Sequence, residues 1–327
     1  MDAHRLTRRT FLKAGAVVAV GGTAVGVLRY QQANRPKVDV QRVGSYDDDL
    51  PGALLAAIQR LGLADSFDGR RVLLKPNLVE TAPLDSPINT NPAVVVAAAE
   101  VFRNLGAREV FVAEGAGHRR DSELILDQSG LGDALDAHAL PFVDLNLQEV
   151  VARPNLGRQT EMETLYLPKP LLEADLIVSM AKLKTHHWTG ATLSMKNLFG
   201  VMPGIVYGWP KNRLHTSGIH QSIVDILATV RPHLAIVDGI VAMEGDGPIM
   251  GTPKAAGVLV TGTNFPAVDA TCCRIMQLDP LRVPYLALAA QRRLGPITDR
   301  AICQTHLTPA DVRQDFQVLD HLADLKA

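Results

Sequence analysis

The stretch from Arg71 to Ala113, RVLLKPNLVETAPLDSPINTNPAVVVAAAEVFRNLGAREVFVA, contains one complete strand–helix–strand unit. A short apolar run opens it at Arg71–Lys75, and a second apolar run closes it at Val110–Ala113. Between the two runs, Asn91-Pro92 is typical of a helix start, and Gly106 is typical of a helix end. Two strands joined across a helix usually lie parallel in one sheet, so this stretch predicts an α/β fold.

The same alternation continues on both sides of this unit. Further strands are predicted at Val38–Val43, Leu140–Val143, Leu176–Met180, Leu234–Val237 and Val258–Thr261, and further helices at Leu50–Leu61, Glu123–Ser129, Ile219–Val230, Ala267–Leu278 and Tyr285–Leu294. We therefore predict a mostly parallel sheet covered by helices on both faces, within one α/β domain at residues 38–327. The length suits one large domain or two lobes around a cleft.

Composition excludes several classes of protein. With 327 residues, of which 47% are hydrophobic and 20% charged, the chain has enough apolar content to fold into a core. Its three cysteines are too few for a disulfide framework. Lys+Arg 33 against Asp+Glu 34 gives a net charge of -1, so the composition argues against a nucleic-acid partner.

The first thirty residues resemble an export signal. Arg8-Arg9-Thr10-Phe11-Leu12-Lys13 matches a twin-arginine motif, and the uncharged stretch Ala14–Leu28 follows it. That stretch is shorter than the roughly 20 apolar residues of a membrane span. We predict a twin-arginine signal at residues 1–30, a linker at 31–37, and the twin-arginine export machinery as a partner. The protein is then expected in the periplasm or at the outer face of the cytoplasmic membrane. No Ala-x-Ala site is evident, so cleavage and anchoring through residues 14–28 both stay open.

Polar residues whose burial costs free energy follow four of the predicted strands. Open α/β sheets bind their ligands beyond these strand ends. The four segments are Lys75-Pro76-Asn77, Glu114–Asp121, Lys182–Trp188 and Asp238–Pro248. Glycines in two of these segments would let the backbone approach a ligand closely. The candidate binding residues are Lys75, Asn77, Glu114, Lys184, Gly245, Asp246 and Gly247.

Histidines are concentrated between Lys182 and His220. This stretch contains His186, His187, His215 and His220 together with Lys182, Lys184 and Lys196. Neutral imidazole is a common metal ligand, but the His-x-x-x-His spacing of zinc proteases is absent. An open catalytic metal site, or no metal, is therefore favoured over a closed structural site.

Two cofactors are disfavoured. Gly115-Ala116-Gly117 lacks the third glycine of a dinucleotide fingerprint, which argues against NAD. No Cys-x-x-Cys-x-x-Cys run exists, so we expect no iron–sulfur cluster.

Seven short motifs together resemble the DUF362 family, which is named for having no established function. They are Lys75-Pro76-Asn77, Asn91-Pro92, Glu114-Gly115, Lys182-Leu183-Lys184-Thr185-His186, Lys196-Asn197-Leu198-Phe199-Gly200, Asp238-Gly239 and Gly245-Asp246-Gly247-Pro248. The resemblance covers most of the chain from about Arg71 to Met276.

A more distant resemblance is to the nickel-pincer lactate racemase family. It rests on Gly115–Glu123, His186-His187-Trp188-Thr189-Gly190, Lys196, Pro203-Gly204 and His215. The resemblance implies His118 and His186 as an acid/base pair, Lys196 as the covalent tether of the cofactor, and His215 as the nickel ligand. His220 is a rival ligand, and we add Asp238 as a candidate metal ligand. Before Lys196 this chain has Leu193-Ser194-Met195, where the racemases have a Gly-Gly-Arg run.

Three functions are compatible with these patterns. The leading hypothesis is an exported enzyme of racemase, epimerase or oxidoreductase type that acts on a small anionic substrate with a metal-containing cofactor. The second is a non-catalytic periplasmic protein that binds an anion or a metal. The third is a hydrolase that uses a divalent metal at Asp238, Glu244 and Asp246, because clustered carboxylates suit Mg²⁺ or Mn²⁺.

Overall fold

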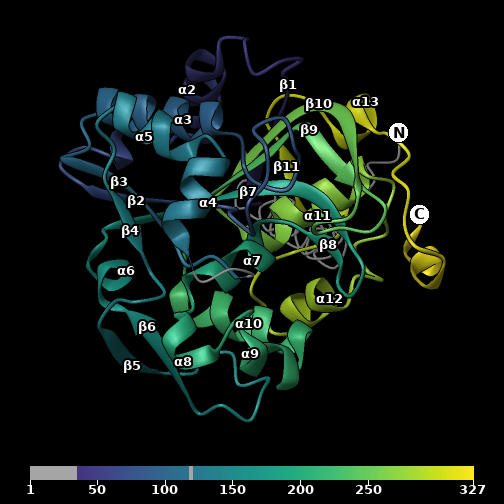
Figure 1. The fold of residues 1–327 in the computed structure, drawn as a ribbon. Helices are drawn as coiled ribbons and strands as arrows, with labels where there is room; N and C mark the ends of the chain where they lie inside the picture. The colour runs from purple at the N-terminus through teal and green to yellow at the C-terminus, as the bar shows by residue number, and fades with distance from the viewer. Residues whose placement is uncertain (1–34, 118–120) are drawn as a thin grey trace, which may run out of the picture.

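The computed structural model describes residues 35–117 and 121–327 (Figure 1). The predicted export signal, the anchor at 14–28, most of the linker, and His118 lie outside the described residues. Among the described residues, no helix combines the length and the apolar character that crossing a bilayer requires.

One large sheet dominates the described part of the chain. Its strands follow the order β11-β1-β10-β9-β7-β2-β3-β4, and β8 pairs with β7 off this path. The bounds are β1 Lys37–Arg42, β2 Arg71–Pro76, β3 Glu109–Glu114, β4 Phe142–Asp144, β7 Leu176–His186, β8 Gly190–Thr192, β9 Leu234–Glu244, β10 Thr252–Gly262 and β11 Cys303–Gln304. A separate antiparallel pair, which the sequence patterns did not predict, consists of β5 (Val150–Pro154) and β6 (Thr164–Pro168).

Most neighbouring strands in the large sheet are parallel. β2 pairs in parallel with β3 and β7, β3 pairs in parallel with β4, and β7 pairs in parallel with β9. Antiparallel pairing joins β9 to β10, β10 to β1, and β7 to β8. The predicted mostly parallel sheet is therefore confirmed.

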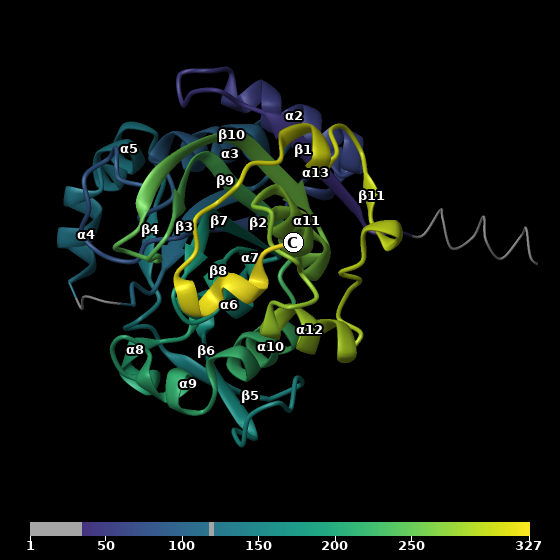
Figure 2. The ribbon, with the colours of Figure 1, turned by 90° about the vertical axis from the view of Figure 1, so that its right-hand side faces the viewer.

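Helices cover both faces of this sheet. Their bounds are α2 Leu50–Leu61, α3 Pro92–Asn104, α4 Ser122–Gln128, α5 Leu131–Ala137, α6 Lys169–Glu173, α7 Ser194–Asn197, α8 Gly204–Tyr207, α9 Asn212–Thr216, α10 Ile219–Val230, α11 Phe265–Ile275, α12 Pro284–Gln291 and α13 Pro309–Val312. Successive strand residues point to opposite faces. In β2, Val72 and Leu74 belong to the core under α2–α5, whereas Leu73 belongs to the core under α7 and α10–α12. In Figure 2, α2 accordingly lies above the sheet, and α10 and α12 lie below it.

Local sequence signals set several helix ends. The Asn91 side chain caps α3 by accepting a hydrogen bond from Ala93 N at 2.9 Å. The Asp49 side chain caps α2 by accepting one from Gly52 N, also at 2.9 Å. The observed bounds of α2 and α10 are the predicted ones.

β7 and β9 extend farther than their apolar runs predicted. Strands were expected at Leu176–Met180 and Leu234–Val237, with loops after them, but His186 still lies within β7. The expectation of loops there is wrong because the polar side chains find partners inside the fold. Lys182 of β7, for example, forms a buried ion pair with Asp238 of β9.

Candidate functional site

A cavity of about 490 Å³ opens at the carboxyl ends of β2, β3 and β7. Its position agrees with the rule that open α/β sheets bind ligands beyond these strand ends. Among the residues proposed from sequence, the structure brings Lys75, Asn77, Glu114, His186, Lys196, His215 and Asp246 to its wall.

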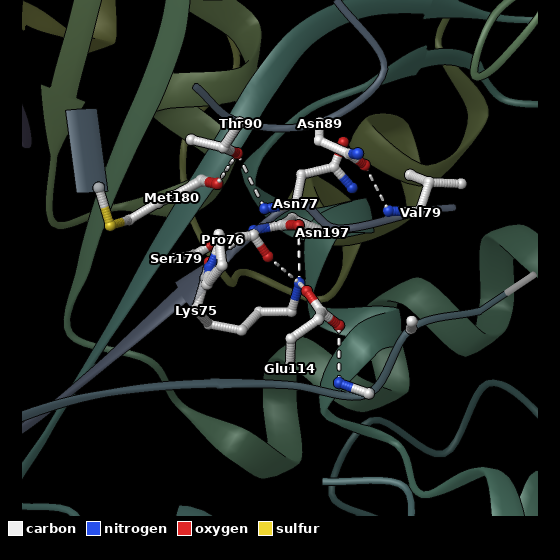
Figure 3. Close-up of polar contacts among 12 residues, drawn as sticks. Lys75, Pro76, Asn77, Val79, Asn89, Thr90, Glu114, Ser179, Met180 and Asn197 are labelled. Atoms are coloured by element: carbon white, nitrogen blue, oxygen red, sulfur yellow. Dashed lines mark hydrogen bonds and ion pairs between the residues drawn. The ribbon is translucent and has the colours of Figure 1, made fainter. Parts of the chain in front are cut away.

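Lys75 and Glu114 form a buried ion pair at the cavity wall, with side chains 1% and 2% exposed (Figure 3). Lys75 Nζ also donates hydrogen bonds to Asn197 Oδ1 at 2.8 Å and to the Pro76 carbonyl at 2.7 Å. Burial lowers the pKa of Lys75 and raises the pKa of Glu114, while the attraction between the two charges opposes both shifts. The donors and acceptors of this pair are largely used within the protein, so it is suited to holding the cavity wall in place.

The backbone of Gly200, in the 3-10 turn η2 (Leu198–Val201), packs directly on this ion pair. A Cβ atom at Gly200 would lie 1.8 Å from Glu114 Oε1 and 2.7 Å from Lys75 Cε. We expect Gly200→Ala to destabilise the fold by about 2–3 kcal/mol, because the buried pair has no room to move. Urea unfolding measures this loss. Gly117→Ala is the control, because a Cβ there meets no described atom within 4 Å. Equal stability of the two variants would contradict the packing argument.

Lys196 contributes an amine with unusual surroundings. It lies on the short helix α7, and its Nζ is 3.7 Å from the centroid of the Phe199 ring. Within the described residues, no hydrogen bond or ion pair engages this Nζ. Burial, with a smaller contribution from the nearby Lys75 charge, lowers the pKa of Lys196 to about 7. About half of the amine is therefore uncharged and nucleophilic at neutral pH.

A buried carboxylate holds α7 in place. Asp269 of α11 accepts hydrogen bonds from Ser194 N at 2.9 Å and from Met195 N at 3.1 Å. These are the first backbone amides of the helix that carries Lys196. Asp269 therefore sets the position of the Lys196 backbone without lining the cavity itself.

The hydrogen bonds of His186 and His215 place the ring proton on different nitrogens. His186 Nδ1 accepts from Trp188 N at 3.0 Å and from Thr189 N at 3.3 Å, so its proton is assigned to Nε2. His215 Nδ1 lies 3.0 Å from the Lys211 carbonyl, so Nδ1 carries the proton and Nε2 keeps its lone pair. Burial is the largest cause that lowers the pKa of both rings, and Lys196 adds to it. His186 is thus suited to donating a hydrogen bond, and His215 to accepting a proton or binding a metal.

Lys211 is a site residue that sequence reasoning missed. It lines the cavity, and its Nζ donates to the Met202 carbonyl at 2.5 Å and to Asn146. Burial lowers the pKa of Lys211 to about 8, although Glu114 and Asp144 oppose this shift. No motif surrounds Lys211, and only folding brings it near Lys75 and Glu114.

Lys184 lies behind the cavity wall. Its Nζ donates hydrogen bonds to the Ile88 carbonyl at 2.7 Å and to the Pro248 carbonyl at 3.3 Å. Among the described residues it has no carboxylate partner. Burial, reinforced by Lys182, Lys196 and Lys75, lowers its pKa well below the ordinary value. Its observed role is to tie two loops to β7.

Asp238 is not beside His215. It accepts hydrogen bonds from Lys182 Nζ at 2.7 Å, Tyr46 Oη at 3.1 Å and Asn91 N at 3.1 Å, and it does not line the cavity. The structure therefore does not assemble these two candidate metal ligands, and the oxygens of Asp238 already have partners.

The other carboxylates of the hydrolase hypothesis are also separated. Glu244 pairs with Lys254 at 2.7 Å, and Asp246 lies 3.2 Å from His187 Nδ1. Across residues 35–117 and 121–327, no three His, Cys, Asp or Glu side chains are grouped so that they could hold a metal ion. The described residues give no support to a carboxylate-bound divalent metal.

Gly245 and Gly247 flank Asp246 but do not line the cavity. Their carbonyls accept hydrogen bonds from Thr185 Oγ1 at 2.8 Å and from His187 N at 2.9 Å. In this loop segment, Asp246 and Pro248 line the cavity.

Two buried atoms of the cavity wall have no hydrogen-bond partner within the described residues: Asn77 Oδ1 and Thr192 Oγ1. In Figure 3, the backbone of Asn77 is held by Thr90, whose hydroxyl in turn donates to the Met180 carbonyl at 2.8 Å. Leaving a buried polar atom unpaired costs about 1–3 kcal/mol, so a hydrogen-bond donor that enters the cavity would find acceptors at these two atoms.

Comparisons with known proteins agree with the motif resemblance. The family described as "Domain of unknown function (DUF362)" matches residues 72–274. Thylakoid-associated protein sll1697 of Synechocystis sp. is 31% identical over 267 residues, which cover 79% of each chain.

Two solved structures are similar in part. The lactate racemase apoprotein from Thermoanaerobacterium thermosaccharolyticum aligns with a TM-score of 0.46 and 15% identity, over 74% of this chain and 57% of that one. A Thermotoga maritima protein aligns with a TM-score of 0.40 and 14% identity, over 71% and 59% of the two chains. This chain spans less than two thirds of each of those proteins.

Proposed function

Starting from the fact that this chain belongs to the DUF362 family, we propose that it is an enzyme that binds a small anionic substrate and carries a cofactor on Lys196. The family has no established function, so the proposal rests on the cavity. The observation that carries it is the Lys196 amine, whose pKa of about 7 makes it nucleophilic at a wall that also holds His186 and His215.

Lysine side chains are the feature of the cavity that would attract an anion. Lys75, Lys196 and Lys211 line it, and Lys184 lies close enough to influence the pKa of His186. Glu80, Glu114 and Asp246 line it as well, but Glu114 faces Lys75, and Asp246 lies toward solvent with its side chain 48% exposed. A carboxylate or phosphate in the cavity would meet ammonium groups and the Nε2–H of His186.

Covalent attachment uses the lone pair of the uncharged amine. Lys196 Nζ would hold the cofactor by a C–N bond to an activated carboxyl or thiocarboxyl carbon, whose leaving group would depart with the proton of the amine. Because Lys196 is partly neutral at pH 7, no separate base is needed to deprotonate it first.

The residues present fit a cofactor that brings its own metal. Lys196 would hold such a cofactor covalently, and His215 Nε2, left free by the Nδ1 contact to Lys211, would supply a single protein ligand. When bound, a metal-bearing pincer supplies a hydride acceptor for a hydroxyl-bearing carbon. His186 Nε2–H would then orient a substrate oxygen, and Lys211 would hold the substrate's anionic group.

Export is part of the same proposal. It rests on Arg8-Arg9 and the uncharged stretch after them, which lie outside the described residues. A relative associated with thylakoids is consistent with a protein that works at or beyond a membrane.

The test is the intact mass of the protein from its native host, followed by peptide mapping. We expect a mass excess located on Lys196, which Lys196→Arg abolishes. Lys169→Arg, at a side chain 50% exposed, is the matched control and should keep the excess. An unmodified Lys196, together with thermal stabilisation by lactate or phosphate without turnover, would instead support a binding protein.

A further inference from the structure

Two large apolar side chains that line the cavity are unusually exposed. Trp188 and Met250 both line the cavity, and they are 61% and 76% exposed. Ile249 lines it beside Met250. Large apolar side chains grouped around an opening favour contact with an apolar part of a ligand, because that contact removes their surface from water.

These apolar side chains are continuous with the reactive groups. The His215 ring packs between Phe199, at 5.5 Å between ring centroids, and Trp188, at 5.7 Å. Phe199 in turn lies under Lys196 Nζ. One row of rings thus connects the amine to the exposed tryptophan.

The two ends of this row differ in chemistry. At the inner end, lysines and the His186 Nε2–H favour an anionic group. At the outer end, Trp188 and Met250 offer apolar surface. A cavity of about 490 Å³ falls in the size range of sites that enclose drug-sized ligands. A three-carbon hydroxy acid would occupy the inner end and leave the outer end unused.

We propose that the ligand of this cavity is an amphiphilic anion, with a carboxylate or phosphate head near Lys211 and the His186 Nε2–H and an apolar chain or ring over Trp188 and Met250. Such a ligand would be the substrate, and this step rests on the proposed function. Its binding can be measured without any reaction.

The probes are butanoate, hexanoate and octanoate, titrated calorimetrically into the full chain at pH 7. We expect affinity to rise about two- to fourfold for each added methylene, as apolar transfer predicts. The double variant Trp188→Ala/Met250→Ala should bind octanoate about tenfold or more weakly than the unchanged protein, and butanoate less than twofold more weakly. Leu281→Ala removes an apolar side chain of comparable exposure, 56%, that does not line the cavity, and should change neither.

The head group is tested in the same titrations. Lys211→Met should weaken the binding of all three carboxylates by a similar factor, and octan-1-ol should bind far more weakly than octanoate. Equal affinities for butanoate and octanoate would overturn the apolar half of the proposal, and equal affinities for octanol and octanoate would overturn the anionic half. If Lys196 is unmodified but affinity still rises with chain length, the cofactor proposal is wrong and the amphiphilic ligand remains supported.

Discussion

At pH 7, Lys196 in protein that carries no adduct is expected to react with an acylating reagent roughly a hundredfold faster than an ordinary lysine. The uncharged amine is the reactive form, and with a pKa of about 7 roughly half of Lys196 is uncharged at that pH. An ordinary lysine, with a pKa near 10.4, is uncharged to well under 1%. The lower basicity of Lys196 reduces this advantage without removing it.

The pH dependence has a definite sign. Below pH 7 the amine gains a proton and labelling of Lys196 falls, whereas above about pH 8 the rate levels off. Labelling of Lys169 should still rise tenfold per pH unit there, because its ion pair with Glu149 raises its pKa. Substoichiometric labelling between pH 5 and pH 9, read by peptide mass spectrometry, measures the labelling rates of Lys196 and Lys169. A Lys196 rate that climbs in parallel with Lys169 above pH 8 would show that the cavity does not depress its pKa.

Breaking the Lys75–Glu114 pair is expected to cost about 3–5 kcal/mol of folding free energy, because either partner alone is left charged and buried. Glu114→Gln keeps the size of the side chain and its contact with Gly115 N, so the loss reports the charge rather than a cavity. Lys75→Met should be comparably destabilising.

The double variant Lys75→Met/Glu114→Gln should recover a large part of this loss, because it leaves no buried charge. Urea unfolding of the four proteins gives a coupling free energy, for which we expect about 2 kcal/mol or more. The exposed pair Lys169–Glu149, with side chains 50% and 71% exposed, is the matched control and should give less than about 1 kcal/mol. Additive losses in the buried pair would mean that the two groups do not depend on each other.

Much of the fold could be predicted from the chain alone. α2 and α10 begin and end where the apolar spacing places them, because amphipathic helices carry their period in consecutive residues. The family was also identified correctly, since its motifs are local runs such as Lys75-Pro76-Asn77. The antiparallel pair β5–β6 was not predicted, and its register is set by contacts between segments rather than by a run of its own.

The candidate site was predicted only in outline. His186, Lys196 and His215 line one cavity, whereas the catalytic, tether and ligand roles that the resemblance implies for them stay predictions. Asp238 instead joins Lys182 and Tyr46, which lies far from it in the sequence. The roles proposed for His118 and for the leader stay predictions, because both lie outside the described residues.

The sequence by itself determined the α/β alternation, the family, and which strand ends carry lysine and histidine, because these properties reside in neighbouring residues. Only the tertiary structure decided which lysines are neutralised and which are not. Lys75 and Lys182 meet carboxylates, whereas Lys196 meets the ring of Phe199 and none of the described carboxylates. The reason is that the pKa of an amine depends on its water and its neighbouring charges in space, and β2, β3, β7 and α7 supply these from distant parts of the chain.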